Sequence, residues 1–377
     1  MKLVIVSHAC ALPQNQHMFS LAAKKRDWHV TMVLPQRWKN EYGKFMDAEL
    51  YPSFSANLIS APVINNGSVP LHAYRMRAGA LLRKLSPDVV FAHNEAYALS
   101  TIQWCRAAKQ NGDIPFGFFS CQNLVKRYPI PFRQSESWVY RNSKFFLPIT
   151  NAVDEVHREK GYCGPSSILP LGFDPDQYHA TESIMKRHRD ASSRTFRFAF
   201  VGRVVEEKGL VNLAAALGKI ADLDWQLIMI GAGPYEPEVK AAFEKHHVAE
   251  RVEWRGFVPH HEVARFFESV DCLLLPSETR ANWKEQFGRV LVESMACGTP
   301  VVGSDSGEIP TIIQKTGGGI AFREANPESC AEALRRMISD TDARCEMAES
   351  GHAYVHKKYA LPVLADQFAT AVESVVK

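Results

Sequence analysis

Two carboxylates, Glu285 and Glu293, stand eight residues apart in the sequence. Phe287 and Gly288 follow the first, and the second falls in a stretch whose pattern predicts a helix. At a rise of 1.5 Å per residue, eight helical positions span roughly 12 Å. One carboxylate could therefore lie at the mouth of a site while the other reaches deeper, which suits a long ligand with hydroxyls at both ends, such as a nucleotide-sugar. The same spacing also fits two solvated side chains, so the flanking sequence has to decide.

The residues that follow Glu293 favour a binding site. Segment 297–300 is typical of a helix end, with Gly298 just past the last turn and Pro300 beyond it. An apolar run at 300–302 then leads into a polar loop at 303–308. In open parallel sheets, ligands bind at the carboxyl ends of strands.

A second candidate site follows the apolar run 198–201. Gly202 would let the backbone approach a ligand, and Arg203 and Lys208 precede a predicted helix at 210–220. Helix N-termini bind phosphate through free amides and the macrodipole, and the two cations would add full charges toward a pyrophosphate. The alternative is an ordinary strand–helix loop with surface cations.

A glycine-rich segment, Ile-Gly-Ala-Gly-Pro at 230–234, is similar to part of a dinucleotide-binding fingerprint. Pro234 and the missing third glycine make it a poor match. We therefore expect no nicotinamide or flavin cofactor.

Short apolar runs alternate with amphipathic stretches along the chain. Such runs fit strands buried on both faces of a sheet, and we expect strands at 3–6, 29–34, 89–92, 116–119, 145–149, 198–201, 226–230, 272–275 and 300–302. Helical spacing lies between them, as at 210–220 and 263–269. The alternation occurs twice, which predicts an α/β protein with two Rossmann-like, doubly wound domains.

Turn-rich and polar segments mark the expected domain boundary. We expect an N-terminal domain over 1–175 and a C-terminal domain over 195–360, with the polar segment 186–195 as a linker or exposed insertion. The amphipathic stretch near the C-terminus predicts a helix within 361–377 that joins the first domain.

Composition points to a soluble globular protein. The 377 residues are 46% hydrophobic and 23% charged, and no apolar run approaches the roughly 18 residues that span a bilayer. The N-terminal apolar run is too short for a secretory signal. Eight cysteines are scattered without a Cys-x-x-Cys motif, which favours reduced thiols in a cytoplasmic protein over a disulfide or zinc framework.

Charge is distributed unevenly along the chain. Residues 1–170 hold 20 basic and 11 acidic side chains (20 − 11 = +9), and the remainder holds 24 and 30 (24 − 30 = −6). The basic half suggests an anionic partner, such as a lipid phosphate or a membrane surface. Segment 71–85 could lie on a membrane as a basic amphipathic helix, or could face the core with a solvated basic side. Nucleic acid is not expected, because no binding motif organises the cations.

The chain resembles retaining glycosyltransferases of family 4 (glycosyl transferases group 1). That family has the GT-B architecture, two Rossmann-like domains that face each other across a cleft. The resemblance covers nearly the whole chain, is strongest over 198–322, and rests on the order and spacing of the segments 201–203, 208–209, 230–234, 255–259, 275–277, 285–293 and 300–304.

The resemblance implies roles in binding a nucleoside-diphosphate sugar. Arg203 and Lys208 would bind the diphosphate and stabilise it as it leaves, while Glu285 would contact hydroxyls of the donor sugar. Glu293 would accept hydrogen bonds from the ribose. The other implied donor contacts are Gly202, Gly231, Phe257, Val258, Phe287, Gly288 and Arg289.

The first domain resembles the family less closely. His93 follows the run 89–92 and is similar to a family histidine that faces the reacting sugar, so it joins Glu285, Arg203 and Lys208 as a predicted catalytic residue; a hydrogen-bonded structural histidine is the alternative. The loop 8–16 lacks the Gly-Gly pair that is common in the family. Acceptor contacts are expected from Asn15, Glu95, Gln122, Asn123 and Lys126.

The resemblance implies transfer of a sugar, with retention, to an acceptor hydroxyl on a saccharide, a lipid-linked saccharide or a small molecule. We expect no metal or other cofactor, since the chain has no Asp-x-Asp motif and fixed cations can stabilise the leaving diphosphate. UDP is favoured as the nucleotide, and polysaccharide assembly in the cytoplasm, with a peripheral contact at the inner membrane face, as the setting. The alternatives are a natural-product glycosyltransferase, a nucleotide-sugar epimerase and a binding protein without turnover.

Overall fold

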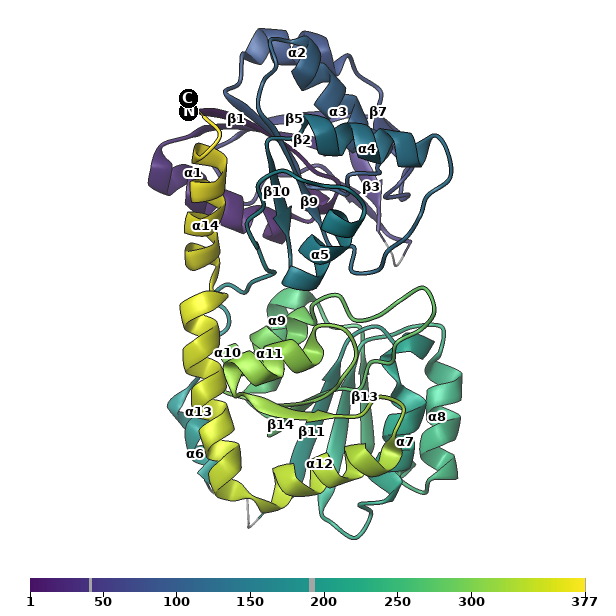
Figure 1. The fold of residues 1–377 in the computed structure, drawn as a ribbon. Helices are drawn as coiled ribbons and strands as arrows, with labels where there is room; N and C mark the ends of the chain where they lie inside the picture. The colour runs from purple at the N-terminus through teal and green to yellow at the C-terminus, as the bar shows by residue number, and fades with distance from the viewer. Residues whose placement is uncertain (41–42, 190–193, 377) are drawn as a thin grey trace. The chain divides into compact units, whose positions relative to one another are not determined.

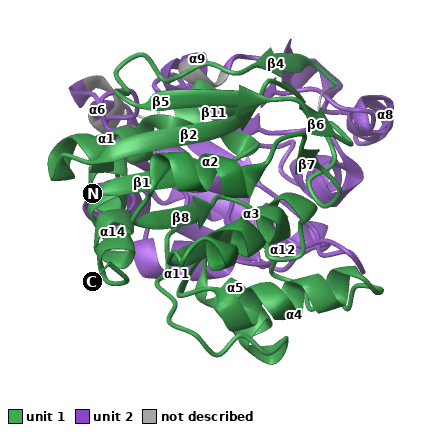
Figure 2. Cartoon of the chain, turned by 90° about the horizontal axis from the view of Figure 1, so that it is seen from above, with its two compact units in different colours: residues 1–170, 361–377 green, residues 171–360 purple. Residues whose placement is uncertain are grey.

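The computed structural model describes residues 1–40, 43–189 and 194–376. The chain divides into two compact units, unit 1 (residues 1–170 with 361–377) and unit 2 (residues 171–360), which are coloured separately in Figure 2. Unit 1 thus breaks at Pro170 rather than at residue 175. Unit 2 includes residues 176–194, which fall outside both predicted domains.

Within the described residues, unit 1 contains a six-stranded parallel sheet in the order β10-β9-β8-β1-β2-β5 (Figure 1). Its strands are β1 (Lys2–Val6), β2 (His29–Pro35), β5 (Asn57–Ala61), β8 (Val89–Ala92), β9 (Phe116–Ser120) and β10 (Phe145–Pro148). Its helices are α1 (His17–Arg26), α2 (Ala78–Leu85), α3 (Leu99–Gln110), α4 (Phe132–Asn142), α5 (Asn151–Glu159) and α14 (Leu361–Glu373). Two small antiparallel pairs, β3 (Arg37–Lys39) with β4 (Phe45–Asp47) and β6 (Val63–Ile64) with β7 (Ala73–Tyr74), accompany the sheet.

The C-terminal helix α14 packs on α1 of unit 1. The Phe368 ring lies 5.0 Å from that of Phe19, and Lys25 pairs with Asp366 at 2.6 Å. The amphipathic pattern of 361–377 therefore ends in a helix whose apolar side is buried within unit 1.

In the part of unit 2 that the structure describes, a second six-stranded parallel sheet has the order β13-β12-β11-β14-β15-β16. Its strands are β11 (Phe196–Val201), β12 (Trp225–Ile230), β13 (Val252–Gly256), β14 (Cys272–Leu275), β15 (Val301–Ser304) and β16 (Gly319–Phe322). Its helices are α6 (Glu182–Arg189), α7 (Leu210–Gly218), α8 (Glu236–Lys245), α9 (His260–Phe267), α10 (Arg289–Ala296), α11 (Ile309–Thr316), α12 (Pro327–Ser339) and α13 (Thr341–Lys358). Phe198 and Phe200 of β11 share a buried core with Leu213 and Leu217 of α7.

The segment predicted as a linker, 186–195, is largely a structured part of unit 2. Its first residues complete α6, where His188 is 1% exposed and its Nε2 lies 2.9 Å from the Gly298 carbonyl oxygen. Arg187 Nε and Arg194 Nη1 donate to the fully buried Asp271 carboxylate at 2.8 and 2.7 Å. The prediction of an exposed linker is therefore wrong for these residues, while 190–193 lie outside the described residues.

Candidate functional site

In unit 2 the predicted donor residues gather at one edge of the sheet. Gly202 follows β11, Gly231 follows β12 and Pro276 follows β14. The strand order reverses between β11 and β14, because β12 and β13 are added on one side of β11 and β14 to β16 on the other. Ligands of doubly wound sheets bind outside the carboxyl ends of the strands at such a switch point. The topology therefore places the candidate donor site beside Gly202 and Pro276.

Lys208 and Glu285, which are 77 positions apart in the sequence, meet at this switch point. Lys208 Nζ donates to Glu285 Oε2 at 2.6 Å, and Ser277 Oγ donates to the same oxygen at 2.9 Å. The two charged side chains are only 16% and 10% exposed. The site thus presents a cation suited to phosphate and a carboxylate suited to sugar hydroxyls in direct contact.

The backbone of Glu285 is held from the loop after β15. Glu308 N donates to the Glu285 carbonyl oxygen at 3.3 Å. Gly307 has a φ of +58°, and a Cβ there would lie 1.9 Å from the same oxygen. Only glycine fits at this position, so the polar loop after β15 fixes the carboxylate that it approaches.

Helix α10 begins later than the sequence predicts. Gly288 adopts the left-handed conformation (φ +73°) at the N-cap, so the helix starts at Arg289 and Glu285 lies in the preceding loop. The estimate of 12 Å between the two carboxylates assumed a continuous helix from Glu285 to Glu293, and that assumption is wrong. Glu293 is 3% exposed and forms an ion pair with Arg289, whose Nε lies 3.1 Å from Glu293 Oε1. The Phe287 side chain is buried and packs near Tyr359, which leaves its backbone for a ligand.

The glycines of segment 230–234 have a structural role. Gly231 has a φ of +134°, and a Cβ there would lie 1.7 Å from the Gly202 carbonyl oxygen. A Cβ on Gly233 would lie 2.0 Å from the Val204 carbonyl oxygen. These glycines let the loops after β11 and β12 pack against each other, which explains the partial fingerprint without a dinucleotide.

The other predicted donor residues line the same edge. Arg203 follows Gly202 directly and is half-buried. Phe257 and Val258 follow β13; Phe257 is 54% exposed and Val258 half-buried. Contacts of these residues with a donor stay predictions.

In unit 1 the chain also reverses its strand order, between β1 and β8, and His93 lies there. Its Nδ1 is 3.1 Å from Ser7 Oγ, which also accepts from Cys10 N at 3.0 Å. Burial lowers the pKa of His93 to about 4, so the ring is neutral near pH 7. A Ser7 hydroxyl that donates to Nδ1 leaves the ring proton on Nε2. The hydrogen bond between Ser7 and His93 fits the alternative of a structural histidine. A neutral ring that can donate from Nε2 also fits the predicted role of His93 at a sugar hydroxyl.

Glu95 belongs to a buried chain of hydrogen bonds at the end of β9. Its carboxylate accepts from Ser120 Oγ and, at 2.8 Å, from Cys121 N. Ser120 Oγ lies 2.8 Å from His157 Nε2, and His157 Nδ1 lies 2.7 Å from the Tyr140 hydroxyl. Burial raises the pKa of Glu95 to about 7, although both hydrogen bonds and Lys160 oppose the shift and Glu136 adds to it.

The predicted acceptor amides are engaged within unit 1. Asn15 Nδ2 donates to the Ala9 carbonyl oxygen at 2.8 Å. Gln122 donates to the Leu124 carbonyl oxygen at 2.9 Å and accepts from Lys160 Nζ at 3.1 Å. Asn123 is buried and Lys126 exposed. These contacts order the loops after β1 and β9, and contacts of these residues with an acceptor stay predictions.

Glu95 should make the stability of the protein depend on pH. Its folded pKa lies above the reference value of 4.5, so the folded state keeps a proton that the unfolded chain has lost. The unfolding free energy therefore falls as the pH rises through this window, by roughly 1–3 kcal/mol. Glu95→Gln replaces the carboxyl group by an amide of similar shape that does not titrate. The variant should therefore show a flatter dependence of unfolding free energy on pH, as measured by urea unfolding between about pH 5 and pH 8. Parallel profiles for variant and wild type would contradict the shift.

Three site residues are missed by the sequence reasoning. Ser277 binds Glu285, Ser7 binds His93, and the Trp283 ring lies 5.1 Å from Lys208 Nζ. Ser277 and Ser7 each directly follow a predicted apolar strand or its terminal proline, which is the signal that could have found them. Trp283 precedes Glu285 by two positions, and nothing in the sequence indicates which way its ring turns.

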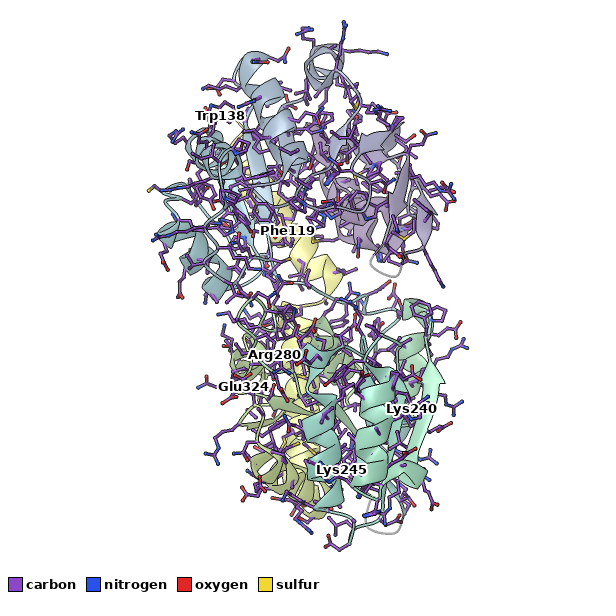
Figure 3. All side chains as sticks on the ribbon, turned by 90° about the vertical axis from the view of Figure 1, so that its right-hand side faces the viewer. Phe119, Trp138, Lys240, Lys245, Arg280 and Glu324 are labelled. Atoms are coloured by element: carbon purple, nitrogen blue, oxygen red, sulfur yellow. The ribbon has the colours of Figure 1, made fainter. Side chains whose placement is uncertain are left out.

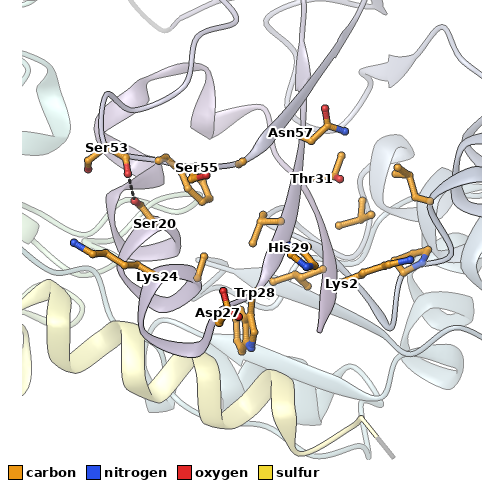
Figure 4. Close-up of a pocket in the computed structure, with 18 residues that line it drawn as sticks. Lys2, Ser20, Lys24, Asp27, Trp28, His29, Thr31, Ser53, Ser55 and Asn57 are labelled. Atoms are coloured by element: carbon orange, nitrogen blue, oxygen red, sulfur yellow. Dashed lines mark hydrogen bonds between the residues drawn. The ribbon is translucent and has the colours of Figure 1, made fainter.

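A pocket of about 780 Å³ in unit 1 lies at the end of the sheet where the strands begin, opposite to their carboxyl ends (Figure 4). It is lined by Lys2, His29 and Asn57, which stand at the starts of β1, β2 and β5. None of the predicted site residues lines it. In the described ranges, no group of three or more His, Cys, Asp or Glu side chains is placed to hold a metal ion, and no helix is long and apolar enough to cross a membrane.

Comparisons with known proteins agree with the geometry. Residues 183–353 match the family model described as glycosyl transferases group 1. The chain is 27% identical over 179 residues to 2-deoxystreptamine glucosyltransferase of Streptomyces kanamyceticus, covering 46% of this chain and 45% of that protein. It is 27% identical over 337 residues to the putative colanic acid biosynthesis glycosyltransferase WcaL of Escherichia coli, covering 87% and 77%. The chain spans about half the length of the first curated relatives that it matches.

Solved structures show the same fold. The crystal structure of Anabaena Alr3699/HepE in complex with UDP aligns with a TM-score of 0.77 at 17% identity, covering 99% of this chain and 100% of that one. The predicted GT-B fold, with two parallel-sheet α/β units, is confirmed. The matches together support a group 1 glycosyltransferase.

Proposed function

We propose that this chain is a glycosyltransferase that moves a sugar from a nucleoside-diphosphate sugar to an acceptor hydroxyl, with retention at the anomeric carbon. The observation that carries the proposal is the contact of Lys208 with Glu285 at the switch point of unit 2. A cation for the diphosphate and a carboxylate for the sugar hydroxyls are the two recognition elements that such a donor requires. The family match over 183–353 supports the same conclusion.

In the proposed step, the bond from the anomeric carbon to the diphosphate oxygen breaks, and a bond to the acceptor oxygen forms on the same face. The leaving diphosphate oxygen takes the acceptor proton. Lys208 and Arg203 stabilise the charge that develops on the diphosphate, as fixed cations can without a metal. Glu293 binds the ribose, and neutral His93 donates a hydrogen bond to the reacting sugar.

For the donor and the setting we favour UDP and the assembly of a polysaccharide in the cytoplasm. The structural neighbour from Anabaena was solved with UDP, and one relative carries the name of a colanic acid glycosyltransferase. A natural-product acceptor is the second candidate, because another relative is a 2-deoxystreptamine glucosyltransferase. An epimerase would convert the nucleotide-sugar without any acceptor. Turnover in the absence of an acceptor would therefore distinguish an epimerase from both kinds of glycosyltransferase.

A panel of UDP, GDP, ADP and their common sugar conjugates, with and without EDTA, tests the donor proposal. We expect one nucleoside diphosphate to raise the melting temperature by several degrees, since saturation at about 100 times Kd adds about 2.7 kcal/mol. EDTA should leave that shift unchanged. Calorimetry would then give the Kd. No stabilisation by any nucleotide would contradict the proposal.

We also propose that unit 1 touches an anionic membrane surface through the loop after β9. Val125 and Ile130 of this loop are 42% and 72% exposed, and Lys126 and Arg127 between them are exposed as well. Apolar side chains among cations suit the interface of an anionic bilayer. In helix α2, Leu82 is fully buried and Leu81 and Leu85 are half-buried, which favours the alternative of a core-facing helix with a solvated basic side.

Co-sedimentation with phosphatidylcholine vesicles containing about 30% phosphatidylglycerol tests this surface. Wild-type protein should bind these vesicles and not pure phosphatidylcholine, and the double variant Val125→Ser/Ile130→Ser should lose most of that binding. Ile64→Ser, at an exposed apolar residue of β6, serves as the control. Equal binding to both vesicle types would argue against an electrostatic contact.

A further inference from the structure

The loop between β14 and Glu285, residues 276–284, is fixed at several points within unit 2. Arg280 N donates to the Trp283 carbonyl oxygen at 2.7 Å, which closes a tight turn. The Arg280 guanidinium lies 3.0 Å from Glu278 Oε2 and 3.5 Å from Glu206 Oε1. Figure 3 labels Arg280 and Glu324 among the side chains of unit 2, and the Glu324 carboxylate accepts from Thr279 N at 2.6 Å. Hydrogen bonds and ion pairs within unit 2 therefore fix the conformation of the turn that carries Trp283.

This turn presents an indole to the donor site. The Trp283 ring centroid lies 5.1 Å from Lys208 Nζ, within the range of a cation–π contact. Lys208 thus has two partners, the Glu285 carboxylate at 2.6 Å and the Trp283 ring. Only the first of these is a group that a donor sugar would engage.

The two partners of Lys208 behave differently when a donor enters. When the Glu285 carboxylate also accepts from sugar hydroxyls, it shares its charge among more donors, so its hold on the ammonium weakens at the moment when Lys208 is needed at the diphosphate. Lysine has a flexible four-carbon stem that loses rotamer freedom when it is fixed. The indole face attracts a cation whether or not the carboxylate is engaged.

We propose that Trp283 is a positioning residue for Lys208: it holds the ammonium toward the donor diphosphate while Glu285 binds the sugar. The role rests on the proposed function, and it acts only through Lys208. Removing the ring should therefore weaken diphosphate binding and transfer in a protein that has Lys208, and should change neither in a protein that lacks it.

The test is a double-mutant cycle of Trp283→Leu and Lys208→Met, read by calorimetry with the nucleoside-diphosphate sugar that binds in the panel and by urea unfolding without ligand. Trp283→Leu should raise the Kd about 3- to 30-fold, and Trp283→Phe, which keeps a ring, should recover most of the loss. In the Lys208→Met background, Trp283→Leu should leave the Kd unchanged. Trp254→Leu, which removes a 5.0 Å contact with Lys240 in the same unit, is the matched control.

Each outcome decides something. An equal loss in both backgrounds, or no recovery with Trp283→Phe, would overturn the positioning role while the proposed function stands. An absence of coupling in the ligand-free unfolding cycle would show that the ring does not interact with Lys208. Failure of every nucleoside diphosphate to bind the wild-type protein would overturn the proposed function and this role with it.

Discussion

Replacing Glu285 by alanine should abolish sugar transfer, lowering kcat by at least about 1,000-fold, while nucleoside diphosphate affinity changes by less than about 10-fold. The carboxylate is proposed to bind sugar hydroxyls, and these contacts strengthen as the anomeric carbon gains positive charge. The diphosphate is bound by Lys208 and backbone amides, which the substitution leaves in place. Glu285→Gln should recover little, because a neutral amide cannot supply the charge.

The measurement is initial-rate kinetics beside calorimetry with the nucleoside diphosphate. Glu328→Ala is the control, because Glu328 forms an exposed ion pair with Lys219 at 2.7 Å in the same unit. Exposed pairs contribute little, so this variant should keep wild-type rates. Unchanged transfer by Glu285→Ala would refute the role given to that residue.

Replacing Lys208 by methionine should weaken nucleoside diphosphate binding about 10- to 100-fold and lower kcat/KM about 100- to 1,000-fold. The ammonium balances charge on the diphosphate, and that charge grows as the bond to the sugar breaks. The effect on the rate should therefore exceed the effect on binding. Methionine keeps most of the length of the side chain and removes the charge together with the three N–H donors.

Lys219→Met, the other half of the exposed pair, is the matched control for Lys208→Met. Both variants should be compared at about 0.05 and 0.5 M salt, because screening acts on exposed charges far more than on buried ones. A Lys208→Met enzyme with wild-type kcat/KM would show that the leaving group is stabilised elsewhere, for instance by Arg203.

The sequence predicts the inner strands of both sheets and one of their edge strands, β10. Every predicted apolar run overlaps a strand, although 145–149 extends one residue beyond β10 and 300–302 begins one residue before β15. The strands that escaped prediction include β5, β13 and β16, which are edge strands with partly exposed residues. An edge strand packs on fewer neighbours, so it does not need a continuous apolar run, and this pattern is all that the prediction used.

The sequence predicts individual residues of the candidate site but not the contacts between them. Lys208 and Glu285 were each assigned to the donor, but their ion pair spans 77 positions and depends on the order of β11 and β14 in the sheet. The start of α10 depends on one backbone angle at Gly288, which composition does not reveal. Sequence patterns thus name candidate residues, while the topology determines which of them touch.

The buried ion pairs of Asp271 determine where a stable fragment of unit 2 can begin. Its carboxylate is fully buried, and burial opposes its ionisation, yet the hydrogen bonds from Arg194 and Arg187 hold its pKa below the ordinary value. A fragment that begins at residue 195, the boundary predicted from sequence, would leave this charge without either guanidinium, at a cost of roughly 3–5 kcal/mol. A fragment that begins before α6 would keep both guanidinium groups, so we expect a stable fragment of unit 2 to need this helix, whose second half composition assigns to a linker.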